Sequence, residues 1–409
     1  MRWGVPIAAA AVVVAAAGAG PVIAAVQGDP VLPSRTAEQL LADLMRNSES
    51  GTLPPLSGTV VETASLGLPV LPGLSGSGSG SGTASPLNLL AGVNQVKVWY
   101  GGEGRMRLAL PGRMSETDLI VNGDQAWLWE SATNTATRLN VPPEAARHDR
   151  EDRETGEDRK GGEHGEDGKG TDGHGPSPLP TGLTPQEAAR EVLARVDDST
   201  AVSVTNTERV ADRAAYQLVI APKDESSLVR EIRLAVDGET LVPLRVQILA
   251  DGSAEPAFEV GFTSVTFTPP APEMFAFTPP AGAKVTESTI GGERPEEQGK
   301  APDEGHERPE GVKRIGEGWT TIVSVPMSEQ ELLDSARPGG EGRNGDPGEA
   351  QNAQEIIKSV LQQARPVTGE WGSGKIIETK LVSVLITDDG RVLAGAVTPE
   401  ALIKAAGTK

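Results

Sequence analysis

The sequence predicts an α+β protein built on a curved antiparallel half-barrel with a helical lid, followed by a small α+β C-terminal unit. Three observations support this prediction. Roughly eleven short segments alternate between apolar and polar residues and end at tight turns, as antiparallel strands do. Two other segments have helical periodicity and carry an apolar stripe that must be buried. A sheet of that many strands has to curl, so it either fills itself with side chains or leaves an apolar cavity.

Two segments predict the helices of the lid. Residues 36–48, "TAEQLLADLMRNS", begin at Thr36, which can cap a helix, and repeat apolar residues at helical spacing. Residues 184–197, "TPQEAAREVLARVD", begin with a threonine, a proline and an early glutamate, which is a favourable order for a helix N-terminus.

Each helix precedes a run of predicted strands. Turns at Gly101-Gly102 and at Asn122-Gly123 predict hairpins in the first run. The first run consists of residues 56–69, 94–102, 105–112, 117–123, 125–131 and 135–141. The second run consists of residues 201–210, 214–222, 229–238, 243–250 and 257–267, and an aromatic stretch at 274–287 closes it.

The N-terminus reads as an export segment. Arg2 precedes a long apolar run that is rich in alanine, and polar residues follow it. This order is typical of a signal peptide. The run is also long enough to span a bilayer, so residues 1–26 are predicted to be either a cleaved signal peptide or an N-terminal membrane anchor. The protein is therefore expected in the cell envelope, secreted or anchored.

Two polar stretches divide the rest of the chain. Residues 144–180 contain dense mixed charge and many glycines, and they are predicted to be disordered. They interrupt a main domain at 36–287. A second polar linker at 288–316 leads to a small α+β unit at 318–409. It is predicted to contain a strand at 318–326, a hairpin at 374–397 that turns at Asp388-Asp389-Gly390, and helices at "SEQELLDSA", at 353–364 and at the C-terminus.

Composition excludes several classes of function. The net charge of −20 argues against nucleic acid as a partner, because a phosphate backbone requires a basic surface. The chain has no cysteine, which excludes thiol nucleophiles, disulfides and thiolate metal sites. All of its histidines fall in charged, glycine-rich stretches: His148, His164, His174 and His306. Ser-His-Asp chemistry therefore lacks an ordered histidine.

No catalytic or metal-binding motif stands out among the other residues. Glu116 and Asp118 flank a turn, and Asp388-Asp389 form one, which is usual for acidic residues at hairpins. The segment "GSGK" at 372–375 lacks the spacing of a phosphate loop and leads into a strand. We therefore expect a non-enzymatic protein without a cofactor or a metal.

The order of elements resembles the LolA/RseB-like superfamily of exported proteins that handle lipids and lipoproteins. The phrases that carry the resemblance are "TAEQLLADL", "SGTVVETASLGLP", "VWYGGEGRMRLALPG", "TDLIVNGDQAWLWESATNTATRL" and "FTSVTFTPPAPEMFAFTPPAGAKV". They cover about 36 to 287. The resemblance implies a half-barrel with a helical lid that binds acyl chains or, in RseB-like members, senses envelope stress. The phrase "GWTTIVSVP" gives 318–409 a fainter likeness to the second domain of RseB-like proteins.

A set of apolar residues on the predicted strands is the candidate lining of a ligand cavity. Trp127 and Trp129 share one face of their strand, with Leu128 on the other, and they fit either a packed core or a cavity wall. Phe275 and Phe277, with Met274, fit an interior plug or a seal at the sheet edge. The full candidate set is Trp127, Trp129, Met106, Leu108, Leu119, Val121, Leu218, Leu234, Val246, Phe275 and Phe277.

Two functions follow from these features. The first is an exported carrier that holds an acyl chain, a lipid or a lipoprotein in an apolar half-barrel. The second is an RseB-like regulator of an envelope-stress sigma-factor pathway that binds a membrane-bound anti-sigma factor. A filled interior favours the regulator, and an open apolar cavity favours the carrier.

Overall fold

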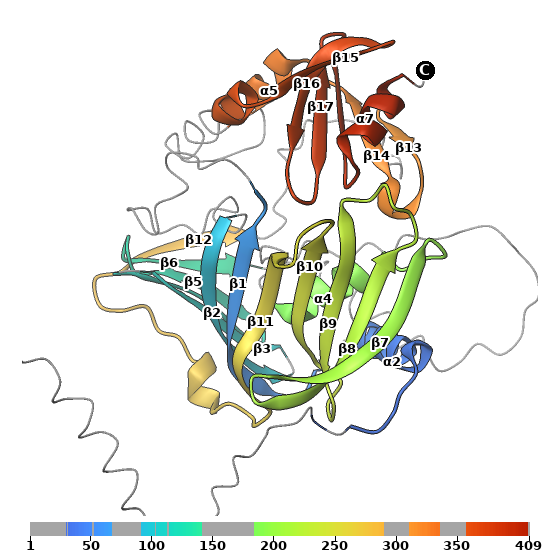
Figure 1. The fold of residues 1–409 in the computed structure, drawn as a ribbon. Helices are drawn as coiled ribbons and strands as arrows, with labels where there is room; N and C mark the ends of the chain where they lie inside the picture. Colours follow the sequence, from blue (N-terminus) through green and yellow to red (C-terminus); the bar gives the residue numbers. More distant parts are fainter. Residues whose placement is uncertain are drawn as a thin grey trace, which may run out of the picture.

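The computed structural model describes residues 30, 32–50, 53–67, 91–102, 104–112, 114–140, 184–289, 311–335 and 357–407. They form two sheets with a few short helices, and the smaller sheet stands above one end of the larger one (Figure 1). The predicted export segment 1–26, the predicted disordered stretch 144–180 and most of the linker 288–316 lie outside the described residues.

The large sheet has twelve strands. Every neighbouring pair is antiparallel except β12 and β6, which run parallel. In spatial order the strands are β12 (Lys284–Thr289), β6 (Thr135–Asn140), β5 (Gln125–Glu130), β4 (Glu116–Asn122), β3 (Arg105–Pro111), β2 (Ala91–Gly102), β1 (Leu56–Ser65), β11 (Pro256–Thr266), β10 (Pro243–Ala250), β9 (Val229–Asp237), β8 (Arg213–Pro222) and β7 (Thr200–Val210).

The predicted α+β class with a curved, mostly antiparallel sheet is confirmed. The parallel edge strand β12 is the departure from the prediction. The chain leaves β11 in the middle of the sheet, forms the short 3₁₀ helix η2 (Pro272–Phe275) and reaches the far edge beside β6. A connection of this length can cross several strands, and only such a crossover can return the chain in the parallel direction.

Two helices lie against one face of the large sheet, which we call the helix face. The helix α2 (Ala37–Ser50) contacts β7 and β8, and α4 (Pro185–Leu193) contacts β10 and β11. In Figure 1, α4 lies behind the strands of this half of the sheet. Thr184 caps α4 as the sequence predicts, because its side chain accepts a hydrogen bond from the backbone nitrogen of Glu187.

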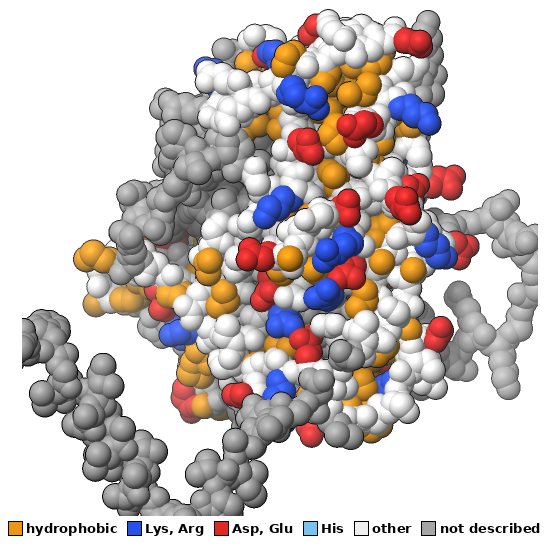
Figure 2. Space-filling view, viewed as in Figure 1, with side chains coloured by type: hydrophobic (Ala, Val, Ile, Leu, Met, Phe, Trp, Pro, Cys, Tyr) orange, Lys and Arg blue, Asp and Glu red, His pale blue; other side chains and the backbone are white. Residues whose placement is uncertain are grey.

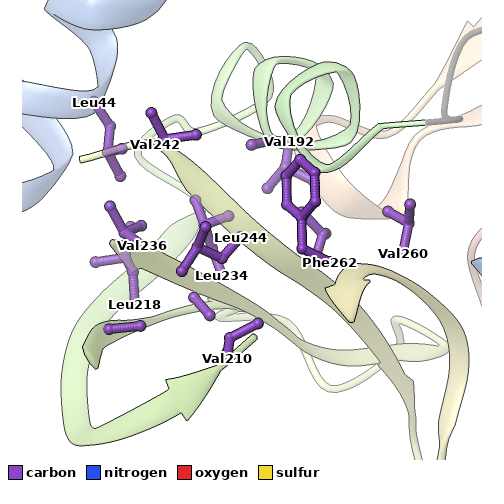
Figure 3. Packing of buried hydrophobic residues seen from close by; sticks show 14 of the residues in the cluster. Leu44, Val192, Val210, Leu218, Leu234, Val236, Val242, Leu244, Val260 and Phe262 are labelled. Carbon is purple, nitrogen blue, oxygen red and sulfur yellow. The ribbon is translucent and has the colours of Figure 1, made fainter. Parts of the chain in front are cut away.

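A single hydrophobic core joins these helices to the sheet (Figure 3). Leu44 of α2 and Val192 of α4 belong to the same cluster as Leu218 and Leu234, both fully buried. The apolar stripes of the two helices are therefore buried as their periodicity predicts. None of the described helices is long and apolar enough to cross a lipid bilayer.

The large sheet curls at its β7 end. The strands β7 and β11 touch although β8, β9 and β10 lie between them in the sheet. Arg245 of β10 also forms an ion pair with Glu208 of β7, which requires the intervening strands to bend. On the side shown in Figure 2, acidic and basic side chains lie interspersed over this sheet.

The small sheet has six antiparallel strands and a core of its own. In spatial order the strands are β13 (Lys313–Ile315), β14 (Ile322–Pro326), β18 (Arg391–Gly395), β17 (Ser383–Thr387), β16 (Gly372–Glu378) and β15 (Arg365–Gly369). The helix α7 (Pro399–Ala406) packs on β17 and β18, and α5 (Glu329–Ser335) follows β14. A 3₁₀ turn, η3 (Gly318–Thr320), precedes β14 where the sequence predicts a strand.

Within the described ranges, hydrogen bonds join the two sheets at three places. The backbone nitrogen of Leu228 donates to Ala396, and that of Thr398 donates to Ser226. The backbone nitrogen of Lys380 donates to the carbonyl oxygen of Leu66, just after β1. The third place is the hydrogen bond between Trp319 and Thr200. The contacts come from separate turns, so together they limit rotation of one sheet against the other.

Candidate functional site

The strand register divides the candidate cavity residues between the two faces of the large sheet. Leu119 is paired with Leu128, whereas Trp127 is paired with Ile120 and Trp129 with Asp118. Because neighbouring residues of a strand point to opposite faces, Leu119 and the two tryptophans cannot line the same cavity. Leu119 belongs to the core on the helix face, so the tryptophans lie on the opposite face.

Most of the candidates are buried in the core. Leu218 and Leu234 are fully buried, and the other core members are Leu108, Leu119 and Val246, with Met106 and Val121 packed against them. This region is filled with side chains in the structure. Contact of any of these residues with a ligand stays a prediction.

Trp127 and Trp129 pack against the segment that leads to β12. The Phe277 ring lies 5.6 Å from the Trp127 ring and 6.1 Å from the Trp129 ring, between ring centroids. All three side chains are half-buried, and none belongs to the main core. Such tilted ring pairs are favourable contacts. The two tryptophans therefore form a platform that holds Phe277 on the face opposite the helices.

Phe275 lies on the same face and is almost completely buried. Its ring lies so close to Gly101 that a Cβ atom there would sit 2.8 Å from the ring. The Arg105 guanidinium lies 6.0 Å from the centre of the Phe275 ring and donates a hydrogen bond to the Gly101 carbonyl oxygen. Phe275 thus anchors η2 on β2 and β3, and its ring leaves no room for a side chain at Gly101.

The structure places an apolar crevice between the two helices. It lies where α2, α4, the segment before β1 and the turn between β9 and β10 meet. The apolar lining consists of Leu44, Leu53, Pro54, Ala189, Leu193, Leu241, Val242 and Pro243. The polar lining consists of Asn47, Gln186, Arg190 and Thr240.

The crevice is narrow in this structure. The space between its atoms, including the open mouth, is about 520 Å³, but the centre of a water-sized molecule can occupy only about 50 Å³ of it. The first volume lies within the range of small-molecule sites, and the second allows only a few waters. The larger volume includes solvent at the open mouth, so the smaller volume describes what the closed crevice can hold. An extended ligand therefore requires α2 and α4 to separate.

Arg190 is the cationic residue among the described residues that line this crevice. Arg190 is an exposed residue of α4, and its guanidinium forms no ion pair within the described part of the chain. Arg190 can therefore attract an anionic head group while the apolar wall takes a hydrocarbon chain. The candidate set omits every residue of this crevice. The apolar stripes of the two helices were the only sequence signal for these residues, because they show that each helix needs an apolar partner. Periodicity within each helix does not show that both helices border the same crevice.

Two glutamates of the large sheet have raised pKa values with structural causes. Burial raises the pKa of Glu62 to about 7, against a weak hydrogen bond from Asn94. A hydrogen bond with Asp118 raises the pKa of Glu116, and burial adds to it. Within the described ranges, no group of three or more histidine, cysteine, aspartate and glutamate residues could hold a metal ion. The four histidines lie outside those ranges.

No family model matches the chain, and no curated protein does. Among solved structures, the chain is similar to the MucA/MucB complex of Pseudomonas aeruginosa, with 13% identity and a TM-score of 0.37 over 90% of this chain and 96% of that one. It is similar to an uncharacterised conserved protein from Thermus thermophilus, with 11% identity and a TM-score of 0.30 over 60% and 98% of the two chains.

A LolA superfamily protein from Nitrosomonas europaea also matches, with 11% identity and a TM-score of 0.21 over 60% of this chain and 99% of that one. LolA-like and MucB/RseB-like proteins, the two kinds that the sequence resembles, are thus both among the matched structures, at low identity.

Proposed function

We propose that the protein is an exported, non-enzymatic binding protein that takes an acyl chain of a lipid or lipoprotein into the crevice between α2 and α4. The observation that carries the proposal is the apolar wall of this crevice, with Arg190 at its side. Transfer of hydrocarbon from water into such a wall contributes about 0.8 kcal/mol per buried CH₂ group, so a chain binds without many polar contacts.

Entry of the acyl chain requires movement of the two lid helices, α2 and α4. Leu44 and Leu193 are buried on opposite sides of the crevice, in helices that rest on different strand pairs. Separation of α2 from α4 exposes these leucines, and an acyl chain inserted between them covers them again. The ligand therefore stabilises the open arrangement through the contacts that only this arrangement offers.

A fluorescent fatty acid tests the proposal directly. The protein should raise the emission of the probe, palmitate should displace it, and native mass spectrometry after mild purification should show bound lipid. Leu53→Trp fills the crevice and should abolish probe binding. Val93→Trp, at an exposed position on β2, adds the same side chain away from the crevice and should leave binding unchanged. Repeated absence of bound lipid together with no displacement would exclude the carrier function.

The second candidate is an RseB-like regulator that binds a membrane-bound partner protein. Two observations favour it: the core of the large sheet is filled, and hydrogen bonds hold the small sheet against it. Pull-down from membranes with the full chain and with a chain lacking 318–409 tests it. Capture of the same proteins by both chains counts against a regulator that uses the small sheet.

A further inference from the structure

A second hollow lies on the face of the large sheet opposite the helices, where β1, β2 and β11 are neighbours. Water-sized molecules can occupy about 290 Å³ of it, which is close to the ~300 Å³ at which small-molecule sites begin. The hollow is shallow and widely open to solvent. Its lining consists of Ser57, Gly58, Thr59, Lys97, Trp99, Ser264, Val265 and Thr266.

Trp99 forms one wall of this hollow, and Arg107 packs against its indole ring. The Arg107 guanidinium lies 5.5 Å from the centre of the indole ring. Arg107 is itself held by Asp118, to which it donates two hydrogen bonds of 2.9 and 3.3 Å. In the register, Trp99 has Arg107 on its β3 side and Ser57 on its β1 side. The ring therefore has the arginine on its β3 side and lines the hollow on its β1 side.

Four hydroxyl side chains line the opposite part of the hollow. Ser57 is paired with Thr266, and Thr59 with Ser264, so the hydroxyls form two neighbouring cross-strand pairs. Hydroxyls at such spacing can donate and accept hydrogen bonds along a ligand that has alternating hydroxyl groups. The pairing of β1 with β11 thus places four hydroxyl groups beside the ring of Trp99.

Lys97 supplies the positive charge in the lining of the hollow. It is exposed, it lies on the same face of β2 as Trp99, and it forms no ion pair in the described part of the chain. The positive charge of Arg107 is neutralised by Asp118 and, at 3.7 Å, by Glu116. The nearby charge of Lys97 lowers the pKa of Glu116, although the hydrogen bond with Asp118 raises it more.

We propose that this hollow binds a glycan whose pyranose ring carries a carboxylate. The apolar C–H face of a pyranose packs on an aromatic ring such as Trp99, and its hydroxyls match the array on β1 and β11. Lys97 pairs with the carboxylate through a charge-assisted hydrogen bond. The hollow and the crevice lie on opposite faces of the sheet and share no lining residue, so one ligand does not block the site of the other.

Titration calorimetry on the full chain with hexagalacturonate tests the proposal, and neutral cellohexaose is the comparison ligand. Hexagalacturonate should bind in the millimolar range and more tightly than cellohexaose. Trp99→Ala should weaken this binding at least about tenfold, which corresponds to 1.4 kcal/mol. Trp127→Ala is the matched control, because Trp127 lies on the same face away from the hollow. Lys97→Gln should remove the preference for the acidic glycan, and Lys313→Gln, an exposed lysine of β13, should not.

The isosteric change Thr59→Val removes one hydroxyl and keeps the aromatic wall. It therefore tests the glycan site even if the Trp99→Ala variant does not fold. It should weaken hexagalacturonate binding several-fold while the thermal midpoint stays near that of the wild type. No heat of binding with hexagalacturonate, equal binding of the two glycans, or unchanged binding by both Lys97→Gln and Thr59→Val would overturn the proposal.

Discussion

The indole nitrogen Nε1 of Trp319 donates a hydrogen bond of 2.8 Å to the hydroxyl of Thr200. Thr200 is the first residue of β7 in the large sheet, and Trp319 belongs to η3, between β13 and β14 of the small sheet. Thr200 also donates to Asp197, so a short chain of hydrogen bonds crosses from one sheet to the other. A polar contact of this kind ties two folded units in one orientation more specifically than apolar packing does.

Trp319→Phe should lower the free energy of unfolding by about 1 kcal/mol, because it removes one hydrogen bond and keeps most of the ring. Amide exchange should accelerate in β14 more than in β3. The matched control is Trp371→Phe: the Nε1 atom of Trp371 is buried and has no hydrogen-bond partner in the described structure, so its removal should cost little or stabilise the protein. Equal losses from both substitutions would show that the hydrogen bond to Thr200 contributes nothing.

Glu62 should make the protein less stable as the pH rises from about 4.5 to about 7. Burial raises its pKa to about 7 in the folded chain, so across this interval the unfolded chain loses a proton that the folded chain keeps. The penalty is absent below this window and constant above it, at up to about 3 kcal/mol. Glu62→Gln should stabilise the protein at pH 8 and have little effect at pH 4. Urea unfolding across this range measures it, and a flat difference between variant and wild type would contradict the assignment.

Asp237 should have the opposite dependence on pH. Burial alone would raise its pKa, but hydrogen bonds from Arg213 and from the backbone and hydroxyl of Thr240 outweigh it and hold the pKa below the usual range. Its contribution is present above the ordinary aspartate pKa and is lost as the pH falls through the lowered value. Asp237→Ala should cost about 3 kcal/mol at pH 7, since it leaves Arg213 without its buried partner. Guanidinium unfolding measures this. Asp251→Ala, at an exposed turn, should cost much less.

The two faces of the sheet should respond differently to truncation of large side chains. Leu218→Ala removes a fully buried side chain of the main core and should cost about 3 kcal/mol. Trp129→Ala removes a half-buried ring whose contact is Phe277, and it should cost about 1 kcal/mol. Chemical denaturation gives both values. A larger loss for Trp129→Ala than for Leu218→Ala would contradict this prediction.

Local patterns predicted most of the elements correctly. The capping Thr184 and the apolar stripe predicted α4, and the turn at Asn122-Gly123 predicted the hairpin of β4 and β5, which turns at Gly123. The cap and the turn depend on residues within a few positions of each other, so a short stretch of sequence is enough to predict them. The prediction of antiparallel pairing was wrong only for β12, which runs parallel to β6, a strand far away in the chain.

The candidate site was harder to predict because it depends on contacts between distant segments. Leu44 and Leu193 line the same crevice although they belong to helices in different halves of the main domain. The hollow beside Trp99 likewise requires β1 to lie next to β11, which the register of the folded sheet establishes.

By itself the sequence determined which residues share a face of each strand: Trp127 with Trp129, and Leu119 with Val121. Only the tertiary structure decided which face the helices cover, and it placed the tryptophans on the other one. The physical reason is that alternation records which side chains point the same way, whereas burial depends on what packs against them. The two helices and the segment around Phe275 and Phe277 are all apolar, and their docking on opposite faces is a property of the whole chain.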